Sequence, residues 1–425
     1  PTLLRPPELF MAKRPFNEQV ETYVTDLMQE RRHSPADTAA KAALFCLSRV
    51  YRFAVQLRLT LYRQGLFRHR TLGCLVVSIG NLTVGGTGKT PVVEVFSRAL
   101  THNGRKVAIL SRGYRSKSNR TFLEKITDKL FRRASDVPPR VVSDGRRLLL
   151  NSDLAGDEPY MLASNLKDVI VLVDKDRVKC GRYAISEFGV DTLILDDGFQ
   201  YLPLKPSLNI MLVDSTRPFD NHHLLPRGLL REPIKNLRRA DFIFLTKSNG
   251  VAHLRHLKEF IKRHNHHAEI IECSHKPQYL RNVYTQEVLA LNYLKGKKIA
   301  SICGIAAPES FERFLKRFGA TLVYLERHAD HHRYTQQEII DCINNGIEKG
   351  AELVLTTEKD AVRFPKLDRC DLPVLLMRVE IDILSGHENF HQCISRICFS
   401  RFSEVQRTDT SSPTPIERLP HVSED

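Results

Sequence analysis

The chain contains 425 residues, of which 64 are Lys or Arg and 49 are Asp or Glu, giving a net charge of +15. Its length predicts two or three domains, and its 42% hydrophobic and 27% charged residues fit a soluble-type globular protein. No apolar run reaches the roughly 18–20 residues of a membrane-spanning helix, no secretory signal is evident, and nine cysteines without a C-x-x-C pair argue against a zinc site. The positive charge makes nucleic acid, an anionic membrane or a phosphorylated substrate the partners to consider.

Two segments precede the first apolar run. Residues 1–36 have mixed charge and are predicted to form an N-terminal extension, with flexibility as one interpretation and no function assigned. Residues 38–66 contain no Asp or Glu and are predicted to form a basic amphipathic helix. Its apolar face carries Leu47, Val50, Tyr51, Ala54, Leu57 and Leu61, and its basic face carries Lys41, Arg49, Arg52, Gln56 and Arg63. Such a helix either lies on an anionic membrane surface or packs on the domain with a solvated basic face.

A glycine-rich segment follows the apolar run at residues 74–79 and opens a helical pattern. This is the strand–loop–helix setting of a phosphate-binding P-loop, in which backbone N–H groups surround phosphate oxygens. The Lys89 side chain can reach the β- and γ-phosphates, and the Thr90 hydroxyl can ligate Mg²⁺. The predicted nucleotide-binding residues are Thr83, Gly85, Gly86, Thr87, Gly88, Lys89 and Thr90.

Further apolar runs alternate with helical patterns, which predicts an α/β fold with a mainly parallel sheet. These runs lie at residues 107–110, 169–173, 192–195, 209–213 and 242–245. Functional side chains are expected at the carboxyl ends of such strands. The sequence Ser111-Arg112-Gly113-Tyr114 places the cation of Arg112 at one strand end, although this pattern alone is unspecific.

Two acidic clusters are candidates for chemistry. Asp196 and Asp197 directly follow an apolar strand, which is the Walker B arrangement that holds Mg²⁺ directly or through water. The other cluster is Gly156-Asp157-Glu158-Pro159, in which Asp157 either accepts a proton from an attacking hydroxyl or caps a helix.

A histidine-rich cluster lies later in the chain, and its members are His328, Asp330, His331, His332 and Tyr334. Its spacing fits no zinc pattern well. A histidine that works with a distant carboxylate as an acid–base pair is the better functional interpretation, and a solvated loop is the alternative.

Together these segments resemble the tetraacyldisaccharide 4′-kinases, the family of lipid A 4′-kinases. The resemblance covers roughly residues 38–385, and its motifs occur in family order. The matching segments are Gly80–Pro91, Leu110–Tyr114, Gly156–Pro159, Leu195–Gln200, Leu224–Pro233, Asp330–Tyr334 and Thr357–Asp360. A P-loop alone is generic, whereas Asp-Asp-Gly-Phe-Gln, Leu-Arg-Glu-Pro and Asp-His-His-x-Tyr in this order are specific.

The resemblance implies a membrane-associated P-loop kinase of lipid A (lipopolysaccharide) biosynthesis. Such a kinase moves the γ-phosphoryl group of ATP to the 4′-hydroxyl of a tetraacylated glucosamine disaccharide 1-phosphate. It implies ATP and Mg²⁺, and a peripheral location on the cytoplasmic face of the inner membrane. It also implies a P-loop α/β core and a smaller C-terminal α/β domain joined by an extended linker. We expect the core at residues 37–275, the linker at 276–296, the smaller domain at 297–400 and a disordered tail at 401–425.

The resemblance also implies roles for individual residues. Asp157 matches the base and His331 its partner, with His332 as the alternative partner. Asp196 and Asp197 match the Mg²⁺-associated pair. Residues that lie near the reacting groups or support them are expected to be Arg112, Glu158, Gln200, Arg231, Glu232 and His332.

Two functions from other classes stay open on the sequence alone. A P-loop GTPase or metallochaperone-like switch is one, because Thr246-Lys247-Ser248-Asn249 follows a strand as a guanine-reading motif would, although it lacks the expected Asp in its fourth position. A non-enzymatic, ATP-dependent membrane partner is the other, because it would use the same basic helix. Nucleic acid is not an expected partner, since no recognised motif accompanies the charge.

Overall fold

The computed structural model describes residues 23–113, 137–248, 254–305, 308–367 and 371–399. The predicted disordered tail lies outside these ranges, as do Tyr114, Asn249 and the first 22 residues. Within the described chain, all strands belong to one sheet with the order β11-β10-β12-β13-β8-β7-β6-β1-β5-β2-β4-β3, and β9 pairs with β8.

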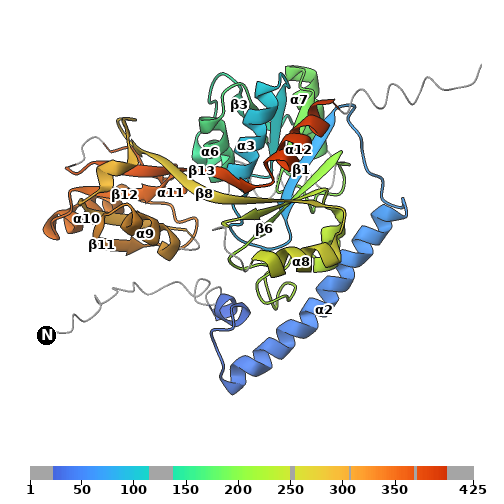
Figure 1. Ribbon diagram of the computed structural model, residues 1–425, viewed down its shortest axis with the longest axis horizontal. Helices are drawn as coiled ribbons and strands as arrows, with labels where there is room; N and C mark the ends of the chain where they lie inside the picture. The colour runs from blue at the N-terminus through green and yellow to red at the C-terminus, as the bar shows by residue number, and fades with distance from the viewer. Residues whose placement is uncertain (1–22, 114–136, 249–253, 306–307, 368–370, 400–425) are drawn as a thin grey trace, which may run out of the picture.

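The part of this sheet that contains β1 is mainly parallel and forms a core lobe (Figure 1). Its parallel strands are β1 (Leu75–Asn81), β2 (Val107–Ser111), β4 (Ile170–Val173), β5 (Thr192–Asp196), β6 (Leu208–Asp214) and β7 (Phe242–Thr246). The edge strand β3 (Arg140–Asp144) runs antiparallel to β4. The predicted α/β fold with a mainly parallel sheet is therefore confirmed.

Helices cover both faces of the core-lobe sheet because alternate strand residues point to opposite faces. Val77 and Ile79 pack in one apolar cluster with α3, α6 and α12, whereas Val76 packs in another with α7. A third cluster lies beneath α8. The helical segments of this lobe are α3 (Lys89–His102), α5 (Ser152–Ala155), α6 (Asp157–Asn165), α7 (Arg177–Phe188), η2 (Ile234–Arg239) and α8 (Leu254–His264).

Two long antiparallel strands, β8 (Glu269–Asn282) and β13 (Val374–Ser385), leave the core lobe as a ribbon (Figure 1). They lead to a second group of elements, which we call the C-terminal lobe. These elements are β9 (Val288–Leu289), η3 (Leu291–Leu294), β10 (Lys298–Cys303), α9 (Pro308–Arg317), β11 (Thr321–Arg327), α10 (Gln336–Glu348), β12 (Leu353–Thr357) and α11 (Glu358–Ala361).

The last helix corrects one expectation from the sequence. Residues 297–400 were expected to form one unit, but α12 (His387–Phe399) lies on the core lobe. Its Phe390 ring stands 5.3 Å from the ring of Phe96 on α3 and 6.5 Å from that of Phe244 on β7. The apolar face of α12 is buried by this contact.

The long helix α2 (Pro35–Arg63) projects along one side of the core lobe (Figure 1). It begins at a capping box in which Ser34 and Asp37 satisfy each other's backbone N–H groups. Ser48 Oγ and Tyr51 Oη donate to backbone oxygens of the core lobe, so Tyr51 of the predicted apolar face contacts the protein. Leu47, Val50 and Leu57 of the same face are exposed. None of the helices in the described part of the chain combines the length and apolar character needed to cross a membrane.

A buried ion-pair network ties the ribbon to both lobes. Arg378 on β13 donates to Glu358 of α11 over 2.7 Å and to Glu94 of α3. Asn165, at the end of α6, donates to the same two carboxylates over 2.8 and 3.0 Å. The Arg378 side chain is only 2% exposed, so its charge is compensated by protein groups and not by water.

Replacing Arg378 with Met should lower the free energy of unfolding by about 3–5 kcal/mol, because two buried carboxylates would lose their cation. Arg98 also pairs with Glu94, but its side chain is 50% exposed. The matched variant Arg98→Met should therefore cost less than about 1 kcal/mol. Urea denaturation of both variants checks this prediction, and equal destabilisation by both would contradict it.

Candidate active site

The glycine-rich loop lies between β1 and α3. Asn81 Nδ2 donates to Thr87 Oγ1 over 2.8 Å and closes the base of the loop. Gly88 has a φ of 80°, and a Cβ at this position would stand 2.8 Å from His275 Nε2. Any other residue would therefore strain the backbone and collide with the ribbon. Lys89 is the first residue of α3, whose N-terminus favours an anion.

The end of β7 supports this loop from behind. Thr246 Oγ1 donates to the Thr87 carbonyl over 2.7 Å. Lys247 Nζ donates to the Gly86 carbonyl over 2.8 Å and to Asp214 Oδ2 over 2.6 Å. The segment that resembles a guanine-reading motif is thus engaged in holding the backbone of the P-loop.

Asp196 ends β5 and is buried. Its Oδ2 accepts a hydrogen bond from Ser111 Oγ over 3.0 Å. Burial, together with the negative charges of Glu158 and Asp197, raises the pKa of Asp196 to about 7. Such a site favours a cation, and carboxylate and hydroxyl oxygens, including that of Thr90, are the ligands that Mg²⁺ prefers. The chemistry of this donor set therefore fits Mg²⁺.

Asp197 faces two cationic side chains. Arg231 donates to both of its carboxylate oxygens, over 2.7 and 2.8 Å, and Lys89 Nζ lies 3.6 Å from Oδ1. Burial raises the pKa of Asp197, but the hydrogen bonds of Arg231 and the charge of Lys89 outweigh it and lower the pKa. Asp197 therefore holds the side chains of Arg231 and Lys89 in place next to the P-loop.

Gln200 and Glu232 support these groups through other residues. Gln200 Nε2 donates to the Asn81 carbonyl over 3.0 Å. Glu232 is buried and accepts a hydrogen bond from Arg239 over 2.6 Å. The Arg239 guanidinium lies 3.9 Å from the centre of the Phe199 ring. Glu232 thus fixes, through Arg239, the loop that follows Asp197. Arg112, another predicted site residue, is exposed directly after β2.

Asp157 is the first residue of α6, and its N-cap is Gly156 and not Asp157 itself. Three side chains of the C-terminal lobe contact its carboxylate. His331 Nδ1 lies 3.1 Å from Oδ2, Arg363 Nε donates to Oδ2 over 2.9 Å, and Arg333 donates to Oδ1 over 3.2 Å. The two lobes therefore meet at this carboxylate.

His331 is the histidine that reaches Asp157. Its other ring nitrogen, Nε2, lies 3.3 Å from Lys359 Nζ. An ammonium group can only donate, so Nε2 accepts and Nδ1 carries the proton toward Asp157. His332 instead points to Glu338, with 3.0 Å between Nε2 and Oε1, and stacks on His328 at 4.3 Å between ring centres.

The surroundings of Asp157 predict a shift in the pH dependence of activity. Burial raises its pKa, but the hydrogen bond of His331 and the charges of Arg363 and Arg333 outweigh it and lower the pKa. If Asp157 must be ionised, activity falls as the pH drops through this pKa. Arg363→Met and Arg333→Met should each raise the pKa and move the acid limb of the kcat profile to higher pH. An unchanged limb in both folded variants would contradict this.

Several of these residues received no role from the sequence. Arg363 and Lys359 lie far from Asp157 in the chain, and only the Thr-Glu-Lys-Asp motif marks their region. Arg177 at the start of α7 is also buried, and its charge acts on Asp196 and Asp197. Arg177 follows strand β4, and side chains that follow the strands of a parallel sheet are expected near its functional site. This position in the sequence could have predicted a role for Arg177.

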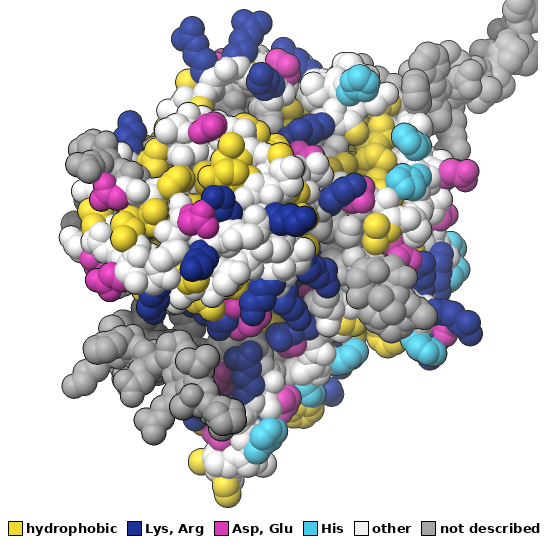
Figure 2. Space-filling view, turned by 60° about the vertical axis from the view of Figure 1, so that its left-hand side comes forward, with side chains coloured by type: hydrophobic (Ala, Val, Ile, Leu, Met, Phe, Trp, Pro, Cys, Tyr) yellow, Lys and Arg dark blue, Asp and Glu magenta, His cyan; other side chains and the backbone are white. Residues whose placement is uncertain are grey.

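Lys and Arg side chains gather where the C-terminal lobe meets the rest of the molecule (Figure 2). This charge distribution favours anionic ligands at the lobe junction.

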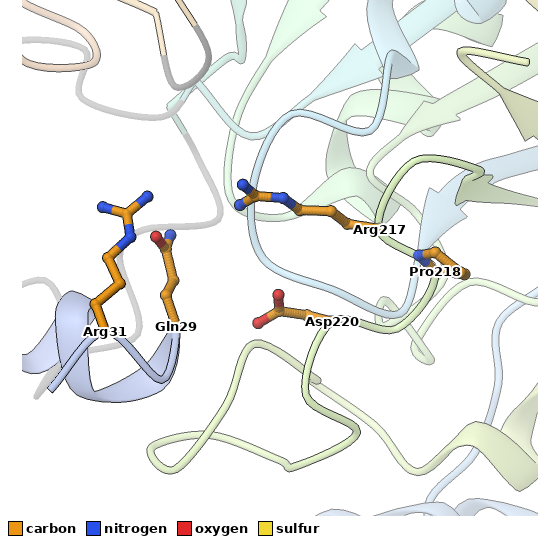
Figure 3. A pocket seen from close by; sticks show the side chains of 5 residues that line it. All are labelled: Gln29, Arg31, Arg217, Pro218 and Asp220. Carbon is orange, nitrogen blue, oxygen red and sulfur yellow. The ribbon is translucent and has the colours of Figure 1, made fainter. Parts of the chain in front are cut away.

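A pocket of about 260 Å³ lies apart from the predicted site residues, between Gln29 and Arg31 and the loop after β6 (Figure 3). Arg217 and Asp220 of that loop point toward the N-terminal segment.

A family model described as tetraacyldisaccharide-1-P 4′-kinase matches residues 40–398. The chain belongs to this kinase family. Tetraacyldisaccharide 4′-kinase of Halothermothrix orenii is 34% identical over 362 residues, which are 83% of this chain and 90% of the relative. The enzyme of the same name from Syntrophus aciditrophicus is 37% identical over 344 residues, or 78% and 87% of the two chains.

A solved structure also resembles this kinase. The crystal structure of LpxK from Aquifex aeolicus in complex with ATP has 27% sequence identity and a TM-score of 0.65. It covers 85% of this chain and 100% of the Aquifex chain. The predicted family and the P-loop kinase fold are therefore confirmed.

Proposed function

We propose that this protein transfers the γ-phosphoryl group of ATP to the 4′-hydroxyl of a tetraacyldisaccharide 1-phosphate, in the formation of lipid A. The observation that carries the proposal is the meeting of two groups of side chains at one site. The P-loop with Lys89 and the Asp196–Asp197 pair form a phosphate site. Asp157, held by the C-terminal lobe, directly precedes Glu158, whose charge acts on Asp196 of that site.

Phosphoryl transfer depends mainly on positioning and on stabilising the charge of the transferred group. Backbone N–H groups of residues 85–90 are suited to hold the β-phosphate, and Lys89 to bridge the β- and γ-phosphates. Thr90, Asp196 and Asp197 would hold Mg²⁺, which supplies further neutralisation of phosphate charge when bound. Arg231 keeps Asp197 ordered for this task.

Asp157 is suited to accept the proton of the attacking 4′-hydroxyl. Its lowered pKa keeps the carboxylate ionised at neutral pH, so an acceptor for the proton is always present. The same lowered pKa makes it a weak base, which suits a loose transition state in which the nucleophile keeps most of its proton until late. His331 orients the carboxylate through Nδ1 and is itself held by Lys359.

The exposed side of α2 is suited to rest on the membrane that holds the acceptor. Val50 and Phe53 are 67% and 69% exposed, and Arg49 and Arg52 beside them are exposed as well. Apolar side chains flanked by cations favour the headgroup region of an anionic leaflet. We therefore propose a peripheral location on the cytoplasmic face of the inner membrane, with no nucleic-acid partner.

Transfer of labelled γ-phosphate to a tetraacyldisaccharide 1-phosphate in mixed micelles tests the proposal. Labelled lipid should form with ATP and Mg²⁺, and excess GTP should compete poorly. A preference for GTP without lipid product would favour a switch protein. Binding of ATP and vesicles without any labelled lipid would favour a non-enzymatic membrane partner.

A further inference from the structure

A basic groove of about 680 Å³ lies where β4 ends and α7 begins. Four cationic side chains and one carboxylate line it, so its lining carries a net positive charge. The cations are Arg70, Lys175, Lys179 and Arg182, and the carboxylate is Asp176. A concave surface lined by one sign of charge concentrates ligands of the opposite sign.

The acidic groups near the groove are already engaged. Asp176 caps α7 by accepting from the backbone N–H groups of Val178 and Lys179 over 3.0 and 3.1 Å. It also accepts the Tyr201 hydroxyl over 3.2 Å. Asp174 pairs with Lys179.

Three cations of the groove remain available to a ligand. Arg70, Lys175 and Arg182 are exposed, and none of them forms an ion pair with any residue that the structure describes. Their positive charge is therefore not neutralised by the protein itself.

The groove adjoins the reaction site through Arg177 and Tyr201. Tyr201 directly follows Gln200 of the Asp-Asp-Gly-Phe-Gln segment. The Arg177 guanidinium lies 4.7 Å from the centre of the Tyr201 ring, and its charge acts on Asp196. On the sheet, β4 lies on the far side of β5 from β1, so the groove is separated from the P-loop, which follows β1.

The groove is also lined by Arg70, which lies in the segment that follows α2. The Arg70 backbone N–H donates to the Pro203 carbonyl over 2.8 Å, which holds the segment after α2 against this wall. Arg58 of α2 donates to the Gln200 carbonyl over 3.2 Å. A ligand that reaches from the reaction site to the membrane-facing helix would pass beside these cations.

We propose that this groove binds the 1-phosphate of the lipid acceptor, an inference that rests on the proposed function. The acceptor carries an anionic phosphate at one end of its disaccharide and reacts at the other. A phosphomonoester carries a charge of about −1.5 to −2 at neutral pH and bonds well to Arg and Lys. A phospholipid headgroup offers related chemistry, but the position of the groove beside Tyr201 favours the acceptor itself.

The test compares two acceptors that differ only in the 1-phosphate, in micelles of neutral detergent. The variant is Lys175→Ala/Arg182→Ala, and the matched control is Lys316→Ala/Arg317→Ala on exposed positions of α9. The parent should prefer the 1-phosphorylated acceptor. The groove variant should raise KM for that acceptor about tenfold, as expected for two exposed ion pairs, and leave kcat and the KM for ATP unchanged. Its preference between the acceptors should largely disappear.

The outcomes separate the groove from the kinase activity. Equal KM changes for both acceptors, or a preference that survives in the groove variant, would overturn the groove assignment while leaving the kinase intact. Weaker binding to phosphatidylglycerol vesicles with an unchanged preference would assign the groove to a phospholipid headgroup and also overturn the proposal. No transfer to either acceptor by the folded parent would instead contradict the proposed function.

Discussion

Replacing Asp157 with Asn should lower kcat by about 10²- to 10⁴-fold, the range expected when a general base is removed. The amide has nearly the same shape as the carboxylate, so the helix start can remain, and its single oxygen can still accept from either Arg363 or Arg333. KM for ATP should change little, because the phosphate-binding residues lie on other elements. Initial rates of labelled-lipid formation measure this effect.

The matched control for this variant is Asp153→Asn. Asp153 lies in α5, and its carboxylate pairs with Arg333 over 2.6 Å, so it shares a partner with Asp157. It does not contact His331 in the described structure. Its replacement should leave kcat within a few-fold of the parent. If both variants lost activity alike, the role of Asp157 would be structural and not catalytic.

Replacing Lys89 with Ala should lower kcat by about 10²- to 10³-fold, because a preorganised cation at a developing negative charge is worth several kcal/mol of barrier. The loss has a second source in this protein. Lys89 and Arg231 both face Asp197, so removing Lys89 also changes the charge balance at that carboxylate.

The exposed Lys205 offers a control for the Lys89 variant, since Lys205→Ala removes the same charge away from the phosphate site. Its kcat should equal that of the parent. A Lys89→Ala enzyme with near-parental turnover in the same assay would refute the assignment of Lys89 to the transferred phosphate.

Much of the fold and the residues of the candidate phosphate site could be predicted from the sequence because the signals are local. The run before Asp196 and the glycines before Lys89 each combine a strand pattern with a chemical motif in consecutive residues. Their meeting at one sheet edge follows from the parallel sheet, because strands of this kind end on the same side.

The residues that the sequence did not assign act over long separations in the chain. Arg363 contacts Asp157 across 206 positions, and Arg378 contacts Glu94 across 284. No periodicity or spacing encodes such a pairing, since it depends on how the ribbon returns. The position of α12 was missed for the same reason, because its apolar face alone does not say which lobe it covers.

The most direct test of the account is a double-mutant cycle on Asp157 and His331, read as kcat for transfer of labelled γ-phosphate to the lipid acceptor. The variants are Asp157→Asn, His331→Gln and the two combined. If the histidine acts through the carboxylate, the double variant should be about as slow as Asp157→Asn alone, because the two residues work as one unit. Effects that multiply, or a His331→Gln enzyme as active as the parent, would contradict a reaction site assembled from both lobes.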